Sequence, residues 1–167
     1  MKLSKAKRGQ LGGNVFIYLF AIIIIGSTFI LGYKYITSTN ENIKKTNLVL
    51  LKNKLVSDIE AISSDYGSSK KISYSIPGSA ELCLFDLDKK EEILDNLPIN
   101  FNQLIKDSIE SNVKKNAFVF GDSIFESYYI GDIEINEPYF NCFKPVVGKI
   151  SFVVEGAGNK ALILDET

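Results

Sequence analysis

The stretch from Gly9 through Tyr33 carries no charged side chain, and this constrains the fold more than any other feature of the sequence. A helix needs roughly 20 apolar residues to cross the hydrocarbon core of a bilayer, and this stretch is longer. Residues 16–25 are apolar at every position, so a helix formed from them is apolar around its whole circumference. That uniform circumference disfavours the alternative, a buried core helix of a soluble domain. Residues 10–36 are therefore predicted to span a membrane.

Basic residues before this segment predict its orientation. Lys7 and Arg8 precede it closely, with Lys2 and Lys5 just upstream, whereas Lys34 alone follows it closely. Positive charge stays on the cytoplasmic side, so the N-terminus is expected in the cytoplasm and the rest of the chain outside the cell or in a periplasm-like space. A cleaved secretory signal is disfavoured because its apolar core would be only about 7 to 15 residues long.

The chain beyond residue 36 is acidic. It holds all 20 acidic residues against 14 of the 19 basic ones, a net charge of −6. A domain with this balance is a poor partner for phosphate backbones, so nucleic-acid binding is disfavoured. The basic pair Lys114-Lys115 is expected instead to be the solvated end of a helix. About 130 residues remain outside the membrane, which is enough for one small globular domain.

The chain has two cysteines, Cys83 and Cys142, and no histidine. In an extracellular domain the two can form one disulfide. Two buried free thiols are the alternative, because each cysteine lies among large apolar neighbours. Two isolated cysteines without histidine fall short of the four ligands that a structural zinc site requires, so no metal is expected.

No group of residues suggests catalysis. The commonest general base is missing, and neither cysteine lies in a nucleophile motif. Asp86 and Asp88 are spaced as in a cation loop, but they lack the glycine and glutamate that an EF-hand loop needs, and a solvated turn is favoured. Gly156-Ala157-Gly158 is expected to be a hairpin turn rather than half of a phosphate loop. We therefore expect neither a cofactor nor enzymatic activity.

An amphipathic helix is predicted after the membrane segment, because leucines and isoleucines recur at intervals of three and four. These residues are Leu48, Leu51, Leu55, Ile59 and Ile62. Two origins of this helix are open: it continues the membrane helix, or it starts afresh at a capping box formed by Ser38 and Glu41. A further helix is expected to begin at Pro98, with Phe101, Leu104, Ile105, Ile109 and Val113 on one face.

Short apolar or alternating segments separated by glycine and proline predict β-strands. They cover residues 72–76, 82–85, 117–120, 123–129, 133–135, 139–143, 149–154 and 160–164. Helices first and strands later predict an α+β fold whose β-rich head is an antiparallel sheet. We divide the chain into a basic leader (1–9), a membrane helix (10–36), an amphipathic stalk helix (37–66) and an extracellular head (67–167).

The motif Lys7-Arg8-Gly9-Gln10 before an apolar helix resembles the archaeal type IV pilin-like proteins that carry a class III signal peptide. The resemblance implies that a membrane-embedded prepilin peptidase cuts between Gly9 and Gln10 and removes the leader. It also implies that the freed helix packs with the helices of other pilin-like subunits. Four glycines allow helices to approach closely, namely Gly12, Gly13, Gly26 and Gly32.

The resemblance has one departure and leaves one alternative. Asn14 occupies the fifth mature position, where pilins often carry a glutamate, and this favours a minor subunit over a major one. Alternatively, the chain is an unprocessed single-pass protein that stays in membrane lipid and binds a partner through its ectodomain. In that case Lys7 and Arg8 only set the orientation.

Overall fold

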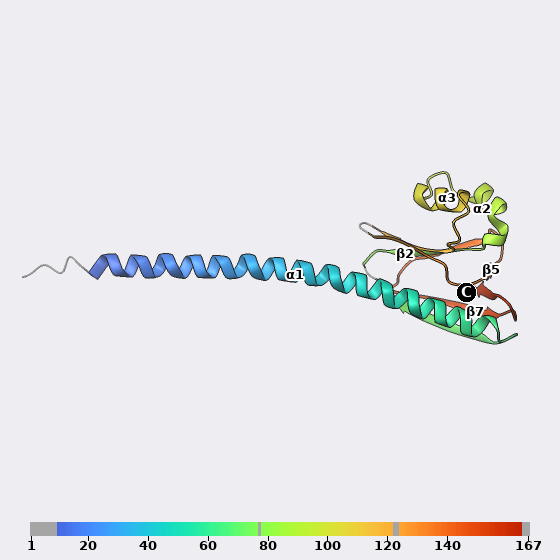
Figure 1. Cartoon of the computed structure of the whole chain (residues 1–167), viewed down its shortest axis with the longest axis horizontal. Coiled ribbons are helices and arrows are strands. Elements are labelled where there is room, and N and C mark those ends of the chain that lie inside the picture. Colours follow the sequence, from blue (N-terminus) through green and yellow to red (C-terminus); the bar gives the residue numbers. More distant parts are fainter. Residues whose placement is uncertain (1–9, 77, 122–123, 165–167) are drawn as a thin grey trace, which may run out of the picture. The chain divides into compact units, whose positions relative to one another are not determined.

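The structure is a computed structural model that describes residues 10–76, 78–121 and 124–164 (Figure 1). The chain divides into two compact units, Met1–Ile43 and Lys44–Thr167. Helix α1 (Gln10–Ser63) contributes to both. It is helical through residues 38–41, so the fresh helix start that the capping box offered is wrong, and the amphipathic segment continues the apolar one. We call the second unit the head.

The head is α+β, as predicted, and contains two four-stranded sheets. The first has the order β1 (Ser69–Ser75), β7 (Lys149–Gly156), β8 (Ala161–Leu164) and β5 (Ile133–Ile135). The second has the order β4 (Ile124–Tyr128), β3 (Ala117–Gly121), β2 (Glu81–Phe85) and β6 (Phe140–Phe143). The short helices are η1 (Leu87–Lys89), α2 (Lys90–Asn96) and α3 (Gln103–Glu110).

The expectation of a single antiparallel sheet needs correction. Strands β5 and β8 pair in parallel, with Ile133 opposite Ala161 and Ile135 opposite Ile163. After β5 the chain leaves the first sheet to add β6 to the second, and it returns as β7. The tight β7–β8 connection then reverses the direction once more, so that β8 runs parallel to β5.

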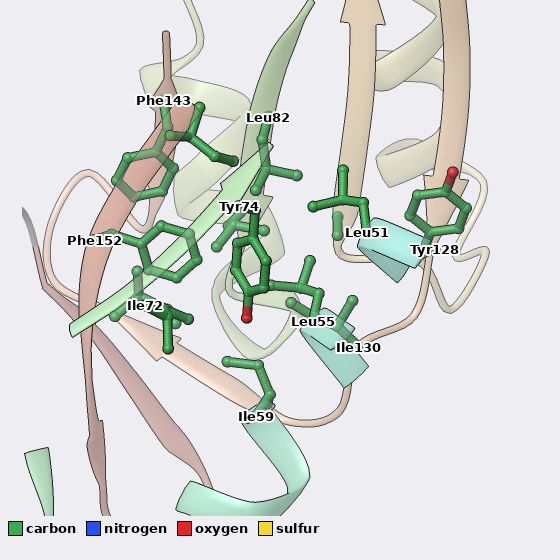
Figure 2. Close-up of a cluster of buried hydrophobic side chains, with 14 of the residues drawn as sticks. Leu51, Leu55, Ile59, Ile72, Tyr74, Leu82, Tyr128, Ile130, Phe143 and Phe152 are labelled. Atoms are coloured by element: carbon green, nitrogen blue, oxygen red, sulfur yellow. The ribbon is translucent and has the colours of Figure 1, made fainter. Parts of the chain in front are cut away.

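The main core lies where α1 packs on the sheets. Its stripe of leucines and isoleucines is buried, as the spacing predicted: Leu48, Leu51, Leu55, Ile59 and Ile62. Figure 2 shows Leu55 and Ile59 pointing toward the side chain of Tyr74 on β1. The same cluster includes residues of both sheets. The stripe that we assigned to a stalk helix thus contributes to the core of the head, and the compact unit begins at Lys44.

A second core lies on the other face of the second sheet. Helices α2 and α3 contribute Ile93, Ile105 and Ile109 to it, and all three are buried. They pack with Phe85 of β2 and Phe118 of β3, whose rings meet edge to face with centroids 5.4 Å apart. Because β2 is covered on both faces, its sequence is an unbroken apolar run from Leu82 rather than an alternating one.

The predicted helix start at Pro98 is wrong. The α3 helix begins after Asn102, whose side-chain oxygen accepts a hydrogen bond from Leu104 N at 3.0 Å and caps the helix. Leu104 is exposed within α3, and Val113 is exposed beyond the helix end. The predicted buried face was wrong at both positions, because Leu104 lies on the exposed side of α3 and the helix ends before Val113.

The basic pair Lys114-Lys115 does not end a helix either, since α3 ends at Glu110. Instead the Lys114 ammonium lies 4.3 Å from the centre of the Tyr129 ring. Lys115 Nζ donates a hydrogen bond to Ser127 Oγ at 2.8 Å. The pair therefore packs along β4 and the residue that follows it.

An ion pair between α1 and β1 predicts an acid-dependent loss of stability. Lys70 Nζ lies 2.8 Å from Asp58 Oδ1, and Tyr74 Oη donates to Asp58 Oδ2 at 2.9 Å. Burial raises the pKa of Asp58, but the hydrogen bonds from Lys70 and Tyr74 outweigh it, so the pKa lies below its usual value. The stabilisation is fully present above the unfolded-state pKa of about 3.9 and is lost as the pH falls through the lower folded-state pKa.

The expected result is a free energy of unfolding that decreases as the pH falls below about 4, with a smaller decrease in Asp58→Asn. Urea unfolding of the detergent-solubilised protein across this pH range measures it. The exposed Asp95, changed to Asn, serves as the control and should leave the pH dependence unchanged. If the free energy of unfolding depended on pH equally in Asp58→Asn and in the unchanged protein, Asp58 would not be the source of the acid-dependent loss.

Candidate functional site

The apolar part of helix α1 is exposed around its whole circumference. Every residue from 15 to 36 is exposed in this structure. Its large apolar side chains expose between 51% and 76% of their surface, and they include Val15, Phe16, Ile17, Leu19, Ile24, Ile30 and Ile36. Within the described residues, α1 is the one helix long and apolar enough to cross a membrane. A surface of this kind is stable only in lipid or against other apolar helices.

Three serine and threonine hydroxyl groups of this helix have hydrogen-bond partners within the helix. Ser27 Oγ and Thr28 Oγ1 each donate a hydrogen bond to the carbonyl oxygen of Ile24 at 2.8 Å. Thr37 Oγ1 donates in the same way to Tyr33 O at 3.0 Å. An unpaired hydroxyl costs free energy in hydrocarbon, whereas these groups need no partner outside the helix. The helix can therefore enter an apolar environment with these side chains paired.

Two of the four glycines proposed for helix packing lie in the described part of this surface. A Cβ atom added to Gly26 or Gly32 would meet nothing within 4 Å, so each leaves an open notch in the helix surface. The surroundings of Gly12 and Gly13 lie outside the described side chains. Lys7, Arg8 and Gly9 of the predicted cleavage motif lie outside the described residues, and α1 begins at Gln10.

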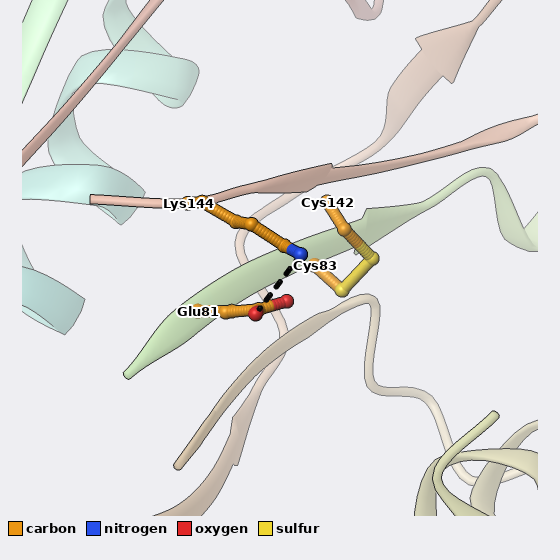
Figure 3. The surroundings of a disulfide bond; sticks show 4 residues. All are labelled: Glu81, Cys83, Cys142 and Lys144. Carbon is orange, nitrogen blue, oxygen red and sulfur yellow. Dashed lines mark ion pairs between the residues drawn. A yellow bond between two sulfur atoms is a disulfide. The ribbon is translucent and has the colours of Figure 1, made fainter. Parts of the chain in front are cut away.

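The head contains the disulfide that the cysteine count allowed. Cys83 on β2 and Cys142 on β6 are bonded, and the alternative of two free thiols is wrong (Figure 3). The two residues lie directly opposite each other in the strand register, with Cα atoms 4.0 Å apart. Next to them, Lys144 Nζ lies 3.6 Å from Glu81 Oε1. The disulfide and this ion pair both fasten the edge strand β6 to the second sheet.

Removing the disulfide is expected to destabilise the head substantially. Cys83 and Cys142 are 59 positions apart, and closing a loop of that length restricts the unfolded chain by about 4 kcal/mol in the chain-entropy description. The double variant Cys83→Ala, Cys142→Ala should lose about this much of its free energy of unfolding. Denaturant titration measures the loss, and the unchanged protein treated with reductant should approach the same midpoint. The prediction would be contradicted if the unfolding midpoint were unchanged in the double variant and in the reduced protein.

The acidic turn of η1 is a structural cap. Asp86 is buried, not solvated as we predicted, and its carboxylate accepts a hydrogen bond from Asp88 N at 3.0 Å. Burial raises the pKa of Asp86. The Asp88 carboxylate lies 2.5 Å from Lys160 Nζ. Among the described residues, no group of three or more acidic or cysteine side chains could hold a metal ion.

Aromatic residues and a glycine-rich segment of the head also have structural roles. Tyr128 is buried in the main core, and Tyr129 Oη donates a hydrogen bond to Asp132. Tyr139 and Phe140 pack against the second core. The segment Gly156-Ala157-Gly158 joins the antiparallel strands β7 and β8, which confirms the hairpin turn.

No protein-family model, curated protein or solved structure matches this chain. The architecture therefore carries the functional argument. A long N-terminal apolar helix followed by a disulfide-bonded, β-rich head is consistent with the pilin-like architecture that the N-terminal motif resembles. The membrane-capable helix and the disulfide together indicate a membrane or extracellular location.

Proposed function

We propose that this chain is a pilin-like structural subunit of a surface filament related to type IV pili. The N-terminus is inserted on the cytoplasmic side, a prepilin peptidase cleaves between Gly9 and Gln10, and the head is displayed outside the cell. The observation that carries the proposal is the apolar helix 15–36, which is exposed on every side and precedes a head with its own core.

Assembly follows from the properties of this helix. A helix that is apolar all round is stable in the bilayer, and it can leave the bilayer only if other apolar helices replace the lipid. When the same contact is repeated from copy to copy without closing on itself, it produces a helical filament. The open notches at Gly26 and Gly32 allow neighbouring helices to approach closely.

The proposed role is that of a minor subunit. Asn14 stands at the position where a pilin glutamate would pair with the new N-terminus of a neighbouring subunit. Without this carboxylate, the charge pairing that aligns successive major subunits is missing. We assign no catalytic activity, cofactor or nucleic-acid ligand to the head.

The first test is the mass and N-terminal sequence of the protein recovered from its native membranes. A chain that starts at Gln10, with or without cyclisation of the glutamine, supports processing by a prepilin peptidase. A chain that starts at Met1 or Lys2 overturns the proposal.

The second candidate is an unprocessed single-pass protein whose ectodomain binds a partner. It is favoured by the length of the apolar segment, which suffices for a permanent span, and by Lys7 and Arg8, which satisfy the positive-inside rule without any peptidase. An intact N-terminus in native membranes would support it.

A further inference from the structure

The turn between β6 and β7 presents two adjacent valines to solvent. Val146 exposes 75% of its surface and Val147 exposes 97%. The turn is tight, because Val146 N donates to Lys149 O at 2.8 Å and Lys149 N donates to Val146 O at 3.1 Å. Val147 has a φ of 51°, a left-handed conformation that β-branched residues rarely adopt. The fold thus holds an apolar pair outward at a cost in backbone energy, as is common at functional positions.

This turn lies at the end of the head where α1 enters it. Lys149 pairs with Ser75 at the end of β1, and Ile76 N donates to Gly148 O at 3.0 Å. Ser75 in turn lines a small cavity together with Asn47 and Leu50 of α1. We call this end of the head its root and define it by residues 44–51, Ser75 and the turn 145–148.

The root and the two residues that flank its turn carry exposed lysines, although the chain outside the membrane segment is acidic overall. Lys144 and Lys149 flank the two valines, and both are exposed. Lys44 and Lys45 begin the head and are also exposed. Lys144 forms an ion pair with an acidic residue, since its Nζ lies 3.6 Å from Glu81 Oε1. An apolar tip flanked by lysines is a typical arrangement for an anionic lipid surface.

The connection between the apolar stretch and the head is short. Only residues 37–43 separate the apolar stretch from Lys44. Even a fully extended connection of this length reaches less than about 30 Å. This short connection limits the distance between Lys44 and the end of the apolar stretch.

We propose that the turn 145–148 docks on the membrane surface, with Val146 and Val147 entering the headgroup region and the flanking lysines contacting anionic lipid. The inference rests only on the N-terminal span, which both candidate functions share. It applies to the subunit while it resides in the bilayer. Apolar side chains gain free energy by leaving water, and lysines gain by approaching anionic headgroups.

The absence of tryptophan from the chain provides a clean test. The variant Val146→Trp places a single fluorophore at the tip. Ile99→Trp is the matched control, because Ile99 is fully exposed on the connection between α2 and α3. Both full-length variants are reconstituted in vesicles of phosphatidylcholine and phosphatidylglycerol, with and without brominated acyl chains. Equal unfolding midpoints for both variants and the unchanged protein verify that the head is intact.

The expected result is quenching of Val146→Trp by brominated lipid that exceeds the quenching of Ile99→Trp about threefold, since an interfacial side chain lies within reach of the acyl region. Equal quenching of the two variants would overturn the proposal. A second result would also overturn the proposal: the emission of Val146→Trp shifts more as the ratio of protein to lipid rises, and brominated lipid does not quench it. This result would indicate that the turn contacts a second copy of the chain instead of lipid. If either of these results were obtained and the native chain still started at Gln10, the membrane-docking proposal would be wrong and the proposed pilin-like function would remain supported.

Discussion

Gly156→Ala is expected to abolish folding of the head. A Cβ atom at Gly156 would overlap the carbonyl oxygens of Ile62 and Asp65 at the end of α1. These backbone atoms are held in place, because Gly67 N donates to Gly156 O and Gly156 N donates to Ser68 O, both at 2.8 Å. Relief requires α1 to move away from β7, which would open the main core.

The loss should exceed about 4 kcal/mol, a large part of the stability of a small domain. Yield of folded protein and urea unfolding in detergent measure it. Ala157→Ser, at the next position of the same hairpin, is the matched control and should behave like the unchanged protein, because Ala157 is half-exposed. A Gly156→Ala protein with an unchanged unfolding midpoint would show that α1 does not pack on β7 in this way.

Gly9→Leu is expected to block removal of the leader completely while leaving membrane insertion intact. A peptidase that binds the residue before its cut is sensitive to bulk there, whereas leucine is as compatible with a membrane segment as glycine. The mass of the protein in the membrane fraction measures processing. The expected mass is that of the unprocessed chain, and surface assembly should be lost with it.

Two variants make this result specific to the cleavage position. Gly9→Ala adds only a methyl group and should still be processed. Ala6→Leu adds bulk inside the leader, away from the cut, and should also be processed. Normal processing of Gly9→Leu would contradict the pilin-like proposal and favour the single-pass alternative.

Much of the fold could be predicted from local pattern. The stripe from Leu48 to Ile62 predicted a helix with one buried face, and the structure buries that face. Alternation at 72–76 and the short apolar runs predicted the strands to within a few residues. The pattern failed between Pro98 and Lys115, where the side chain of Asn102 rather than proline determines the helix start.

The candidate site, too, could be predicted from the sequence only in part. Uniform apolarity of residues 16–25 predicted a helix without a polar face, and the described helix has none there. The role of the turn 145–148 was missed, since Val146 and Val147 looked like ordinary apolar residues near a glycine. Only their exposure and their place beside Ser75 and the start of the head distinguish them.

The sequence alone determined the membrane-length helix, the α+β class and the pair of cysteines available for a disulfide. These properties depend on charge and on spacing between neighbouring residues, so they can be recognised before any long-range contact is known. The tertiary structure decided the division into two sheets, the parallel pairing of β5 with β8 and the pairing of Cys83 with Cys142. It also decided that Gly156 must lie against the end of α1. Such contacts join residues far apart in the chain, where local propensity has no influence and the burial of both partners selects the arrangement.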